Sequence, residues 1–216
     1  MINKNLKFLN SFWIRLIAII TMTLDHIGVF LGGDSFNAFR ILGRLAFPLF
    51  MFLTVQGALK TSNKKRYILR LSALVLFTGI ALTVLTFVGG FYREVAFTSG
   101  NIFIDLLLTV LIITIFESEN KKIKPLVALP IIYIIYSAIV IKIEGCGCTG
   151  LFYWHFPALR VQYGFLTLFL GLGFYFSYKL AKKYSPVNID ENQNQKYLNI
   201  FSAGRTVVSS ILTMLI

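Results

Sequence analysis

The chain is a succession of apolar runs, each about as long as a helix that crosses a bilayer, separated by short polar turns. Runs of the 17–25 apolar residues that a bilayer-spanning helix needs occur near residues 13–33, 40–60, 67–90, 101–117, 125–143, 160–181 and 198–216. Six are clear, whereas the last carries Arg205 among several polar residues and could instead lie along the interface. This pattern, with 56% hydrophobic residues, predicts an all-α fold. We expect a polytopic membrane helical bundle of about seven transmembrane helices, forming one domain over residues 1–216.

The formal net charge of +12 is distributed along the chain in a regular way. Alternate turns hold most of the basic residues: Lys4, Lys7 and Arg15, then Lys60, Lys64, Lys65, Arg66 and Arg70, then Lys121, Lys122 and Lys124, then Lys179, Lys182, Lys183 and Lys196. The intervening turns hold only Arg93, Lys142 and Arg160. Such alternation is typical of topogenic charge, not of nucleic-acid binding. It predicts a multi-pass protein of the plasma membrane with a cytoplasmic N-terminus and a retained first helix.

Four titratable side chains interrupt the first two apolar segments, Ile14–Gly33 and Arg40–Lys60. They are Asp25, His26, Arg40 and Arg44. Because charge at membrane depth is costly, such residues usually face the protein interior and mark a working site. With an outward-running first helix, His26 is expected roughly 10 Å below its outer end.

Two further segments are expected to reach the same outer layer. The fourth segment brings Asn101 and Asp105 there, and the sixth brings Gln162 and Tyr163. This layer is therefore the predicted site. Histidine is the natural proton acceptor near neutral pH, so His26 suits general-base work on an amine or hydroxyl.

The expected partners within the cluster follow from helix geometry. Asp25 points about 100° away from His26 and is poorly placed to hold its ring. We therefore expect His26 to be oriented from another helix, by Arg44, Gln56 or Asp105. Arg40 and Arg44 are four residues apart and are expected to share a helix face, which Phe47 and Met51 continue. Two cations in the first turns of a helix oppose its dipole, so they need nearby anions or an anionic substrate group. Pro48 predicts a kink in the second segment.

Plain structural explanations compete with each of these assignments. Arg40 could reach to the interface as a helix-end residue, and Asp25 with Arg44 could form an inter-helix ion pair without chemistry. Cys146 and Cys148 are spaced too closely for an ordinary disulfide, and with His155 they lack a full metal-ligand set. No metal is predicted, and redox or intermolecular pairing of these cysteines stays open.

Several stretches resemble the TraX family. They are Leu24–Gly28 (LDHIG), Phe39–Phe50 (FRILGRLAFPLF), Val55–Gly57 (VQG), Asn63–Tyr67 (NKKRY) followed by Leu69–Leu71 (LRL), Asn101–Phe103 (NIF) with Leu106–Leu108 (LLL), and Tyr163–Gly164 (YG). The match is dense over the first 70 residues and loose beyond them. Two positions depart from the family pattern: Gln162 stands where an Asp is usual, and Asn199–Arg205 lacks the usual aromatic-Tyr-Pro-His element.

The resemblance implies a membrane acyltransferase, because the family is named for the conjugative pilin acetylase. It implies acetyl-CoA as the acyl donor and an acceptor outside the cytoplasm. Three classes of acceptor stay open: a protein N-terminus, a glycan and a lipid headgroup. Asp25, His26 and Arg44 are then the expected catalytic residues, with Arg40, Asn101, Asp105 and Gln56 binding substrate. His26 would act as base or carry the acyl group. Two other functions stay open: a small proton-coupled transporter and a non-catalytic structural membrane protein.

Overall fold

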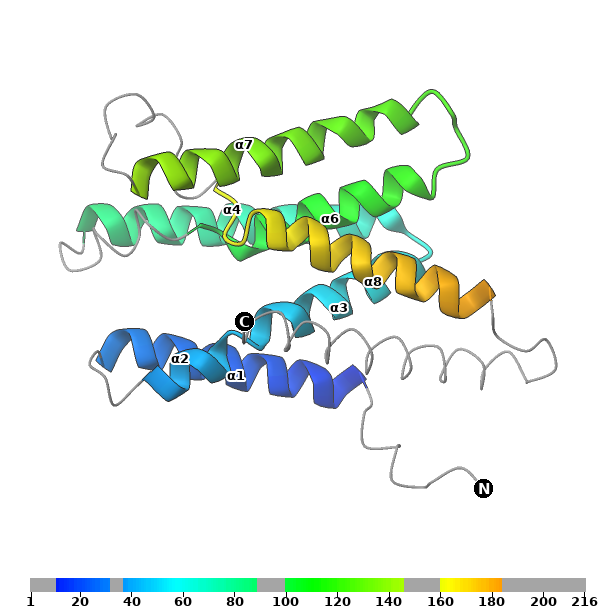
Figure 1. Cartoon of the computed structure of the whole chain (residues 1–216). Helices are drawn as coiled ribbons and strands as arrows, with labels where there is room; N and C mark the ends of the chain where they lie inside the picture. Colours follow the sequence, from blue (N-terminus) through cyan, green and yellow to red (C-terminus); the bar gives the residue numbers. More distant parts are fainter. Residues whose placement is uncertain (1–10, 32–36, 89–99, 146–159, 184–216) are drawn as a thin grey trace, which may run out of the picture. The chain divides into compact units, whose positions relative to one another are not determined.

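A computed structural model describes residues 11–31, 37–88, 100–145 and 160–183. All regular structure in these ranges is helical, and no strand occurs in them. The helices are α1 (Ser11–Leu31), α2 (Asn37–Gly43), α3 (Ala46–Lys60), α4 (Lys64–Val88), α6 (Ile102–Phe116), the 3-10 helix η4 (Lys124–Val127), α7 (Ala128–Gly145) and α8 (Phe165–Lys183) (Figure 1). The all-α prediction is confirmed, and the last predicted segment, 198–216, lies outside the described residues.

The chain divides into two compact units, which are described separately below. The first comprises Met1–Gln56 and Leu170–Ile216, and the second comprises Gly57–Phe169. The boundaries fall inside α3 and α8. A single membrane domain over the whole chain stays a prediction.

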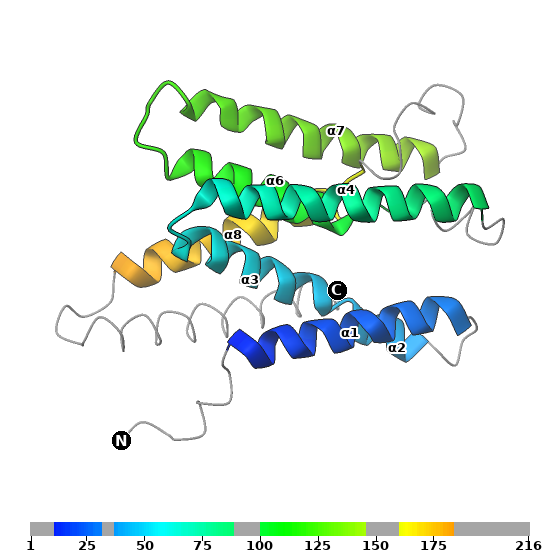
Figure 2. The same cartoon turned by 180° about the vertical axis from the view of Figure 1, so that it is seen from behind.

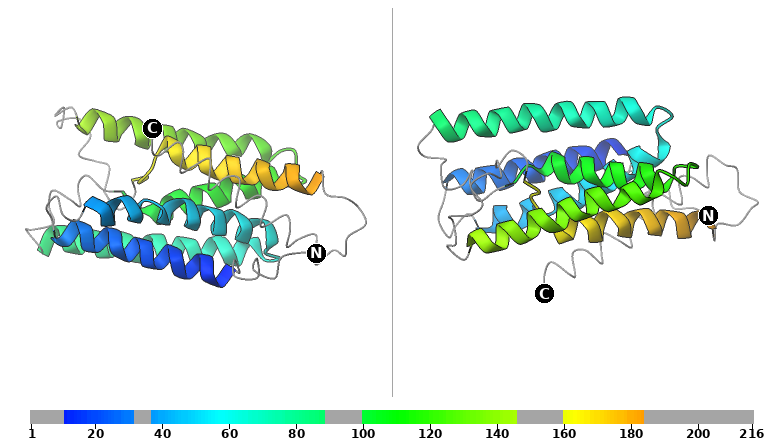
Figure 3. Two further views of the ribbon diagram at one scale, coloured as in Figure 1. Left: turned by 60° about the horizontal axis from the view of Figure 1, so that its bottom comes forward. Right: turned by 90° about the horizontal axis from the view of Figure 1, so that it is seen from above.

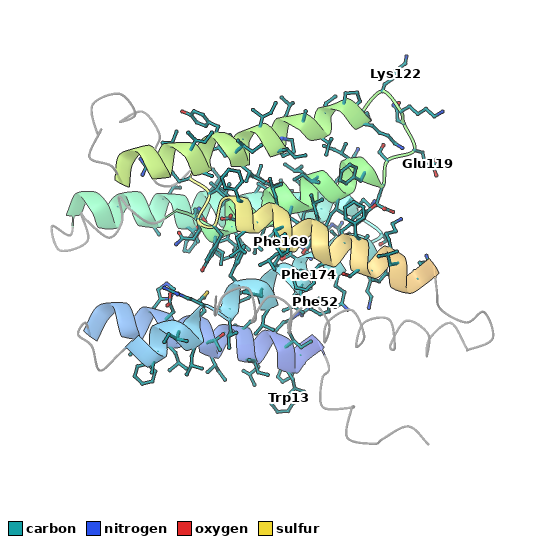
Figure 4. All side chains as sticks on the ribbon, viewed as in Figure 1. Trp13, Phe52, Glu119, Lys122, Phe169 and Phe174 are labelled. Atoms are coloured by element: carbon teal, nitrogen blue, oxygen red, sulfur yellow. The ribbon has the colours of Figure 1, made fainter. Side chains whose placement is uncertain are left out.

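In the first unit, α1 and α2 lie side by side (Figure 2). The core face of α3 is formed by Phe47, Met51 and Val55, which follow one another at the four-residue spacing of a single helix face. Phe52, the residue after Met51, is also buried, and its ring meets that of Phe174 edge-on at 5.5 Å between centroids (Figure 4). Aromatic pairs favour this geometry.

The chain breaks between α2 and α3, at Arg44 and Leu45, where a single helix with a kink at Pro48 was predicted. Pro48 is the third residue of α3. Its ring would clash with the carbonyl of Arg44, four residues earlier, and it has no N–H to donate to that carbonyl. The chain therefore turns at Arg44 instead, and Leu45 N donates to Leu42 O at 3.1 Å. Proline is tolerated in the first turn of the new helix.

In the second unit, α6 contacts both α4 and α7, and Figure 3 shows α7 lying along α6. Buried residues cover most of the circumference of α6, including Ile104, Asp105, Thr109 and Ile112. No residue of α6 is exposed, and a helix without an exposed face is typical of the interior of a bundle. The predicted run 125–143 begins with η4, and the run 160–181 becomes helical only at Phe165. The residues between Arg160 and Gly164 form a bent, non-helical segment.

Large apolar side chains are exposed on the outer faces of several helices. On α4 they include Leu69, Leu76, Phe77 and Ile80, with exposed fractions of 64–72%. Others lie on α1, α7 and α8: Phe12, Ile19, Leu129, Ile132, Phe165 and Phe169. Such surfaces are uncommon on a monomeric soluble protein and typically face a membrane or a partner.

One described stretch, Ile41–Lys60, meets the length and hydropathy of a membrane crossing, with a mean hydropathy of 1.5. The apolar stretches Ile102–Phe116, Lys124–Val140 and Phe165–Leu180 are shorter. About seven crossings with a cytoplasmic N-terminus therefore stay a prediction.

Candidate functional site

His26 lies on α1 with its side chain exposed and its ring held by its own helix. Its Nδ1 lies 2.8 Å from the carbonyl oxygen of Met22, one turn earlier. A carbonyl oxygen only accepts hydrogen bonds, so Nδ1 must carry the proton. In the neutral ring Nε2 is then the unprotonated nitrogen, which can accept a proton. The expectation that another helix orients this ring was wrong, because the backbone of α1 itself supplies the partner.

Asp25 is half-buried against the last residue of α2. A Cβ atom built on Gly43 would lie 2.2 Å from the Asp25 Cβ and 2.8 Å from its Cα. Real Cβ atoms essentially never approach other atoms so closely, so glycine is what allows α1 and α2 to meet here. This contact joins two of the stretches that carry the family resemblance, and it sets Asp25 beside the turn that follows α2.

Arg44 is exposed in that turn, directly after Gly43. The predicted common face of Arg44, Phe47 and Met51 does not form, because Phe47 and Met51 are fully buried. Nor does Arg44 lie in the first turns of a helix: it follows the C-terminal end of α2, where a cation is favoured by the helix dipole. Within the described residues, no ion pair joins Arg44 to Asp25.

The remaining predicted residues of the first unit are placed less fully. Arg40 lies in α2, and its side chain is outside the described part of the structure. Cys146 and Cys148, which belong to the sequence of the second unit, also lie outside the described residues. Gln56 is half-buried on α3 and is the last residue of the first unit before the boundary.

Asp105 belongs to the second unit and is completely buried in the first turn of α6. Its Oδ2 accepts a hydrogen bond from Gln162 N at 2.7 Å, and its Oδ1 accepts one from Tyr163 N at 3.3 Å. The hydroxyl of Thr167 also donates to Oδ1. Sequence reasoning expected this carboxylate to serve an arginine or His26. The structure instead gives it backbone and hydroxyl donors from the bent segment and the start of α8.

Asn101, also buried, is the N-cap of α6. Its Oδ1 accepts from Phe103 N at 3.1 Å, and its Nδ2 donates to Thr78 Oγ1 at 2.9 Å and to Val75 O at 3.2 Å. Asparagine before an apolar run is a recognised start signal for a helix, so the capping role was readable from the sequence. Its link to α4 was not readable, because Thr78 is 23 residues away and only packing brings it close.

The structure thus groups the predicted site residues into two sets, one in each unit. Asp25, His26 and Arg44 gather where α1 meets the end of α2, and Asn101 and Asp105 gather at the start of α6. Whether the two sets share one cavity stays a prediction. Ser137 and Thr167 were missed: Ser137 Oγ accepts from Val161 N at 3.1 Å, and serine or threonine in an apolar helix gives no sign of such a partner.

An all-helical chain with apolar outer faces, and with polar side chains where α1 meets the end of α2 and at the start of α6, is typical of a helical membrane protein. A family model described as TraX protein matches residues 12–189, and the chain belongs to the TraX family. A curated relative, "Probable fimbrial assembly protein FimC, serogroup H1" of Dichelobacter nodosus, is 35% identical over 81 residues. That match covers 36% of this chain and 31% of the relative, so the chain matches less than a third of that protein. No solved structure matches the chain.

Proposed function

We propose that this protein is a membrane-embedded acyltransferase that moves an acetyl group from acetyl-CoA to an amine or hydroxyl acceptor outside the cytoplasm. The observation that carries the proposal is the exposure of the His26 ring and the position of its proton. Its ring is exposed, and its hydrogen bond to Met22 O directs the proton to Nδ1 and leaves Nε2 as the acceptor. Membership of the TraX family supports the same reaction.

In the proposed reaction, Nε2 of His26 takes the proton from the acceptor as its nitrogen or oxygen attacks the thioester carbonyl. The carbon–sulfur bond then breaks, and the thiol of coenzyme A leaves with the proton from the imidazolium. The guanidinium of Arg44 stabilises the negative charge that develops on the carbonyl oxygen. Asp25 holds the contact between α1 and α2, and Arg40 and Gln56 bind the substrates.

We further infer that the acceptor is the N-terminus of a pilus or fimbrial subunit. The relative named as a fimbrial assembly protein favours this class over a glycan or a lipid headgroup. A peptide with a free N-terminal amine would accept the acetyl group, and the same peptide with a blocked amine would not.

The surface of the helices supports a place in the membrane. The outer face of α4 is strongly apolar from Leu74 to Ile80, and bilayer hydrocarbon is the environment that such a face tolerates best. The start of α4 and the turn after α6 lie at the same end of the second unit (Figures 1 and 2). Both carry exposed cations, including Arg66 and Lys122, the latter projecting from the turn in Figure 4. Excess lysine and arginine are typical of cytoplasmic turns.

The test is acetyl transfer by purified wild-type protein and by His26→Ala, with labelled acetyl-CoA and the two peptides. Removing a general base is expected to lower kcat by about 10²–10⁴-fold. The matched control is Thr23→Ala, because Thr23 is exposed on the same helix and bonds only to its own backbone, at Ile19 O. Full transfer by His26→Ala, or uptake of a solute without any acyl donor, would discard the assignment.

A further inference from the structure

Two turns of the second unit lie at the same end of it: the turn between α3 and α4, and the turn between α6 and η4. The helices α4 and α6 contact each other and run in opposite directions (Figure 1). At the start of α6, Asn101 Nδ2 donates to Thr78 Oγ1 at 2.9 Å. From Thr78 back to Lys64, α4 covers roughly 21 Å at 1.5 Å per residue. From Asn101 to Phe116 the chain covers roughly 22 Å, so both turns reach the same level (Figure 2).

Positive charge dominates this end of the second unit. Within residues 60–70 and 116–127, eight cations stand beside two carboxylates, those of Glu117 and Glu119. The cations are Lys60, Lys64, Lys65, Arg66, Arg70, Lys121, Lys122 and Lys124, and all but the half-buried Lys64 are exposed. Lys122 and Glu119 both project outward from the turn after α6 (Figure 4). Such a surplus of positive charge attracts an anionic partner.

Apolar side chains lie among the lysines in the turn after α6. Ile123, Leu126 and Leu129 are exposed and follow one another at three-residue intervals. Three residues are one turn of a 3-10 helix, which the chain forms at η4, so these side chains fall on one side of it. The same side continues along α7 through the exposed Ile132 and Ile139, at the spacing of one helix face.

This surface therefore combines cations with an apolar line that runs on into the outer face of α7. Nucleic acid or an acidic peptide would match the charge, but either would leave the apolar line in water. A bilayer covers both parts, because hydrocarbon meets the face of α7 while headgroup phosphates meet the lysines. Lysine side chains suit this depth, since their stems lie on apolar surface and their ammonium groups reach outward.

We propose that the turn after α6, continued by the start of α7 and supported by the cations of the turn after α3, binds the headgroups of anionic phospholipids. Lys121, Lys122 and Lys124 contact the headgroup phosphates, and Ile123 and Leu126 enter the adjoining part of the acyl chains. Anionic lipids are preferred, because the choline of a zwitterionic headgroup already offsets its phosphate charge. The inference concerns the second unit alone. It adds a lipid preference to the proposed place in the membrane and does not depend on acyl transfer.

The first measurement is lipid retention by the purified full-length protein in micelles that hold equal amounts of phosphatidylglycerol and phosphatidylcholine. Native mass spectrometry gives the ratio of the two lipids bound. Replacing Lys121, Lys122 and Lys124 together by glutamine should lower this ratio by about fivefold or more. Replacing the same three by arginine is the matched control and should keep the ratio, because the charge is retained. Glu119→Gln should not lower it, since that change removes negative charge.

The second measurement places the apolar side chains relative to the bilayer. Ile123→Cys, Leu126→Cys and the polar control Asn120→Cys are made with Cys146 and Cys148 replaced by serine. Each carries an environment-sensitive fluorophore in vesicles that contain 30 mol% phosphatidylglycerol. We expect a nitroxide on the upper acyl chain to quench the labels at 123 and 126, and aqueous iodide to quench the label at 120 more strongly than those two.

Four results would overturn the proposal. They are equal retention of the two lipids by the wild type, an unchanged ratio in the glutamine variant, a ratio that falls as far in the arginine variant, and iodide quenching at 123 and 126 as strong as at 120. A glutamine variant that keeps its lipid ratio but loses binding of a glutamate-rich peptide would assign the surface to an acidic protein instead. Retention of neither lipid would count against the membrane location itself, and acetyl transfer is measured separately from all of these.

Discussion

At the scale of single residues, glycine decides how closely α1 and α2 approach. Asp25 packs on Gly43 with its backbone as well as its side chain, and a backbone atom cannot swing aside as a flexible side-chain end can. Gly173 on α8 is the opposite case, since a Cβ atom there would meet nothing within 4 Å. Gly43 therefore has no room for a larger side chain, whereas Gly173 does.

Gly43→Ala is accordingly expected to lower the free energy of unfolding by about 1–3 kcal/mol, the usual cost of overpacking. It should also impair acetyl transfer by displacing Asp25. Gly173→Ala should be neutral or stabilise by about 0.5–1 kcal/mol, because alanine suits a helix interior better than glycine. Denaturant unfolding in detergent micelles measures both. Equal effects of the two substitutions would contradict the close contact at Gly43.

At the scale of helices, several of the polar contacts lie where helices begin. Pro48 interrupts the helix predicted over the second apolar run, and the resulting turn between α2 and α3 contains Arg44. Asn101 caps α6, and Asp105 links the first turn of α6 to the start of α8. The polar groups gather there because helix starts leave backbone N–H groups that must find partners.

Pro48→Ala should allow α2 and α3 to merge, since alanine restores the N–H that can bond to the Arg44 carbonyl. Stability should change by less than about 1 kcal/mol, while hydrogen exchange at Arg44–Phe47 slows and kcat falls. Pro130→Ala is the matched control, because Pro130 is likewise the third residue of its helix, α7. Unaltered exchange around Arg44 would show that another feature causes the break.

Asn101→Ala should destabilise more than Asn63→Ala, although both asparagines accept from backbone N–H groups at a helix start. Asn63 is exposed, so water replaces it and the loss is about 1 kcal/mol. Asn101 is buried and also donates to Thr78 and Val75, which adds roughly 1 kcal/mol or more. Unfolding free energies of the two variants test this order, and a larger loss at Asn63 would reverse it.

At the scale of the molecule, the membrane is the environment that makes sense of the outer faces. The turn after α3 and the turn after α6 are both at the basic end of the second unit and are expected on the cytoplasmic side (Figure 2). A bilayer would also explain why side chains of the protein bind three successive N–H groups of the bent segment, since hydrocarbon offers no partners.

Cysteine labelling tests this orientation in a background where Cys146 and Cys148 are serine. Ser62→Cys and Asn120→Cys lie in the two exposed turns at the basic end. A membrane-impermeant maleimide should label neither in intact cells and both in inverted vesicles, because lysine and arginine favour the cytoplasmic side. Labelling of the two positions from opposite sides would exclude the predicted topology.

The sequence predicted the helices well and their contacts poorly. The apolar runs in the sequence located α1, α4 and α6 to within a few residues, because the hydropathy of a segment can be read from its own residues. The kink predicted at Pro48 is instead a break at Arg44, a few residues earlier, because the proline ring clashes with the carbonyl four positions before it. The partner of His26 was sought on another helix, although a ring nitrogen can reach the carbonyl one turn back on its own helix.

The amino-acid sequence by itself determined the all-helical class and the family, and it supplied the residues that we propose for the chemistry. These properties depend on hydropathy, spacing and residue type, which are local. Only the tertiary structure decided which groups donate hydrogen bonds to the Asp105 carboxylate. It also decided that Asp25 packs against Gly43. Those contacts join residues 57 positions apart in one case and distinct helices in the other. They depend on packing, and no local pattern encodes which atoms packing brings together.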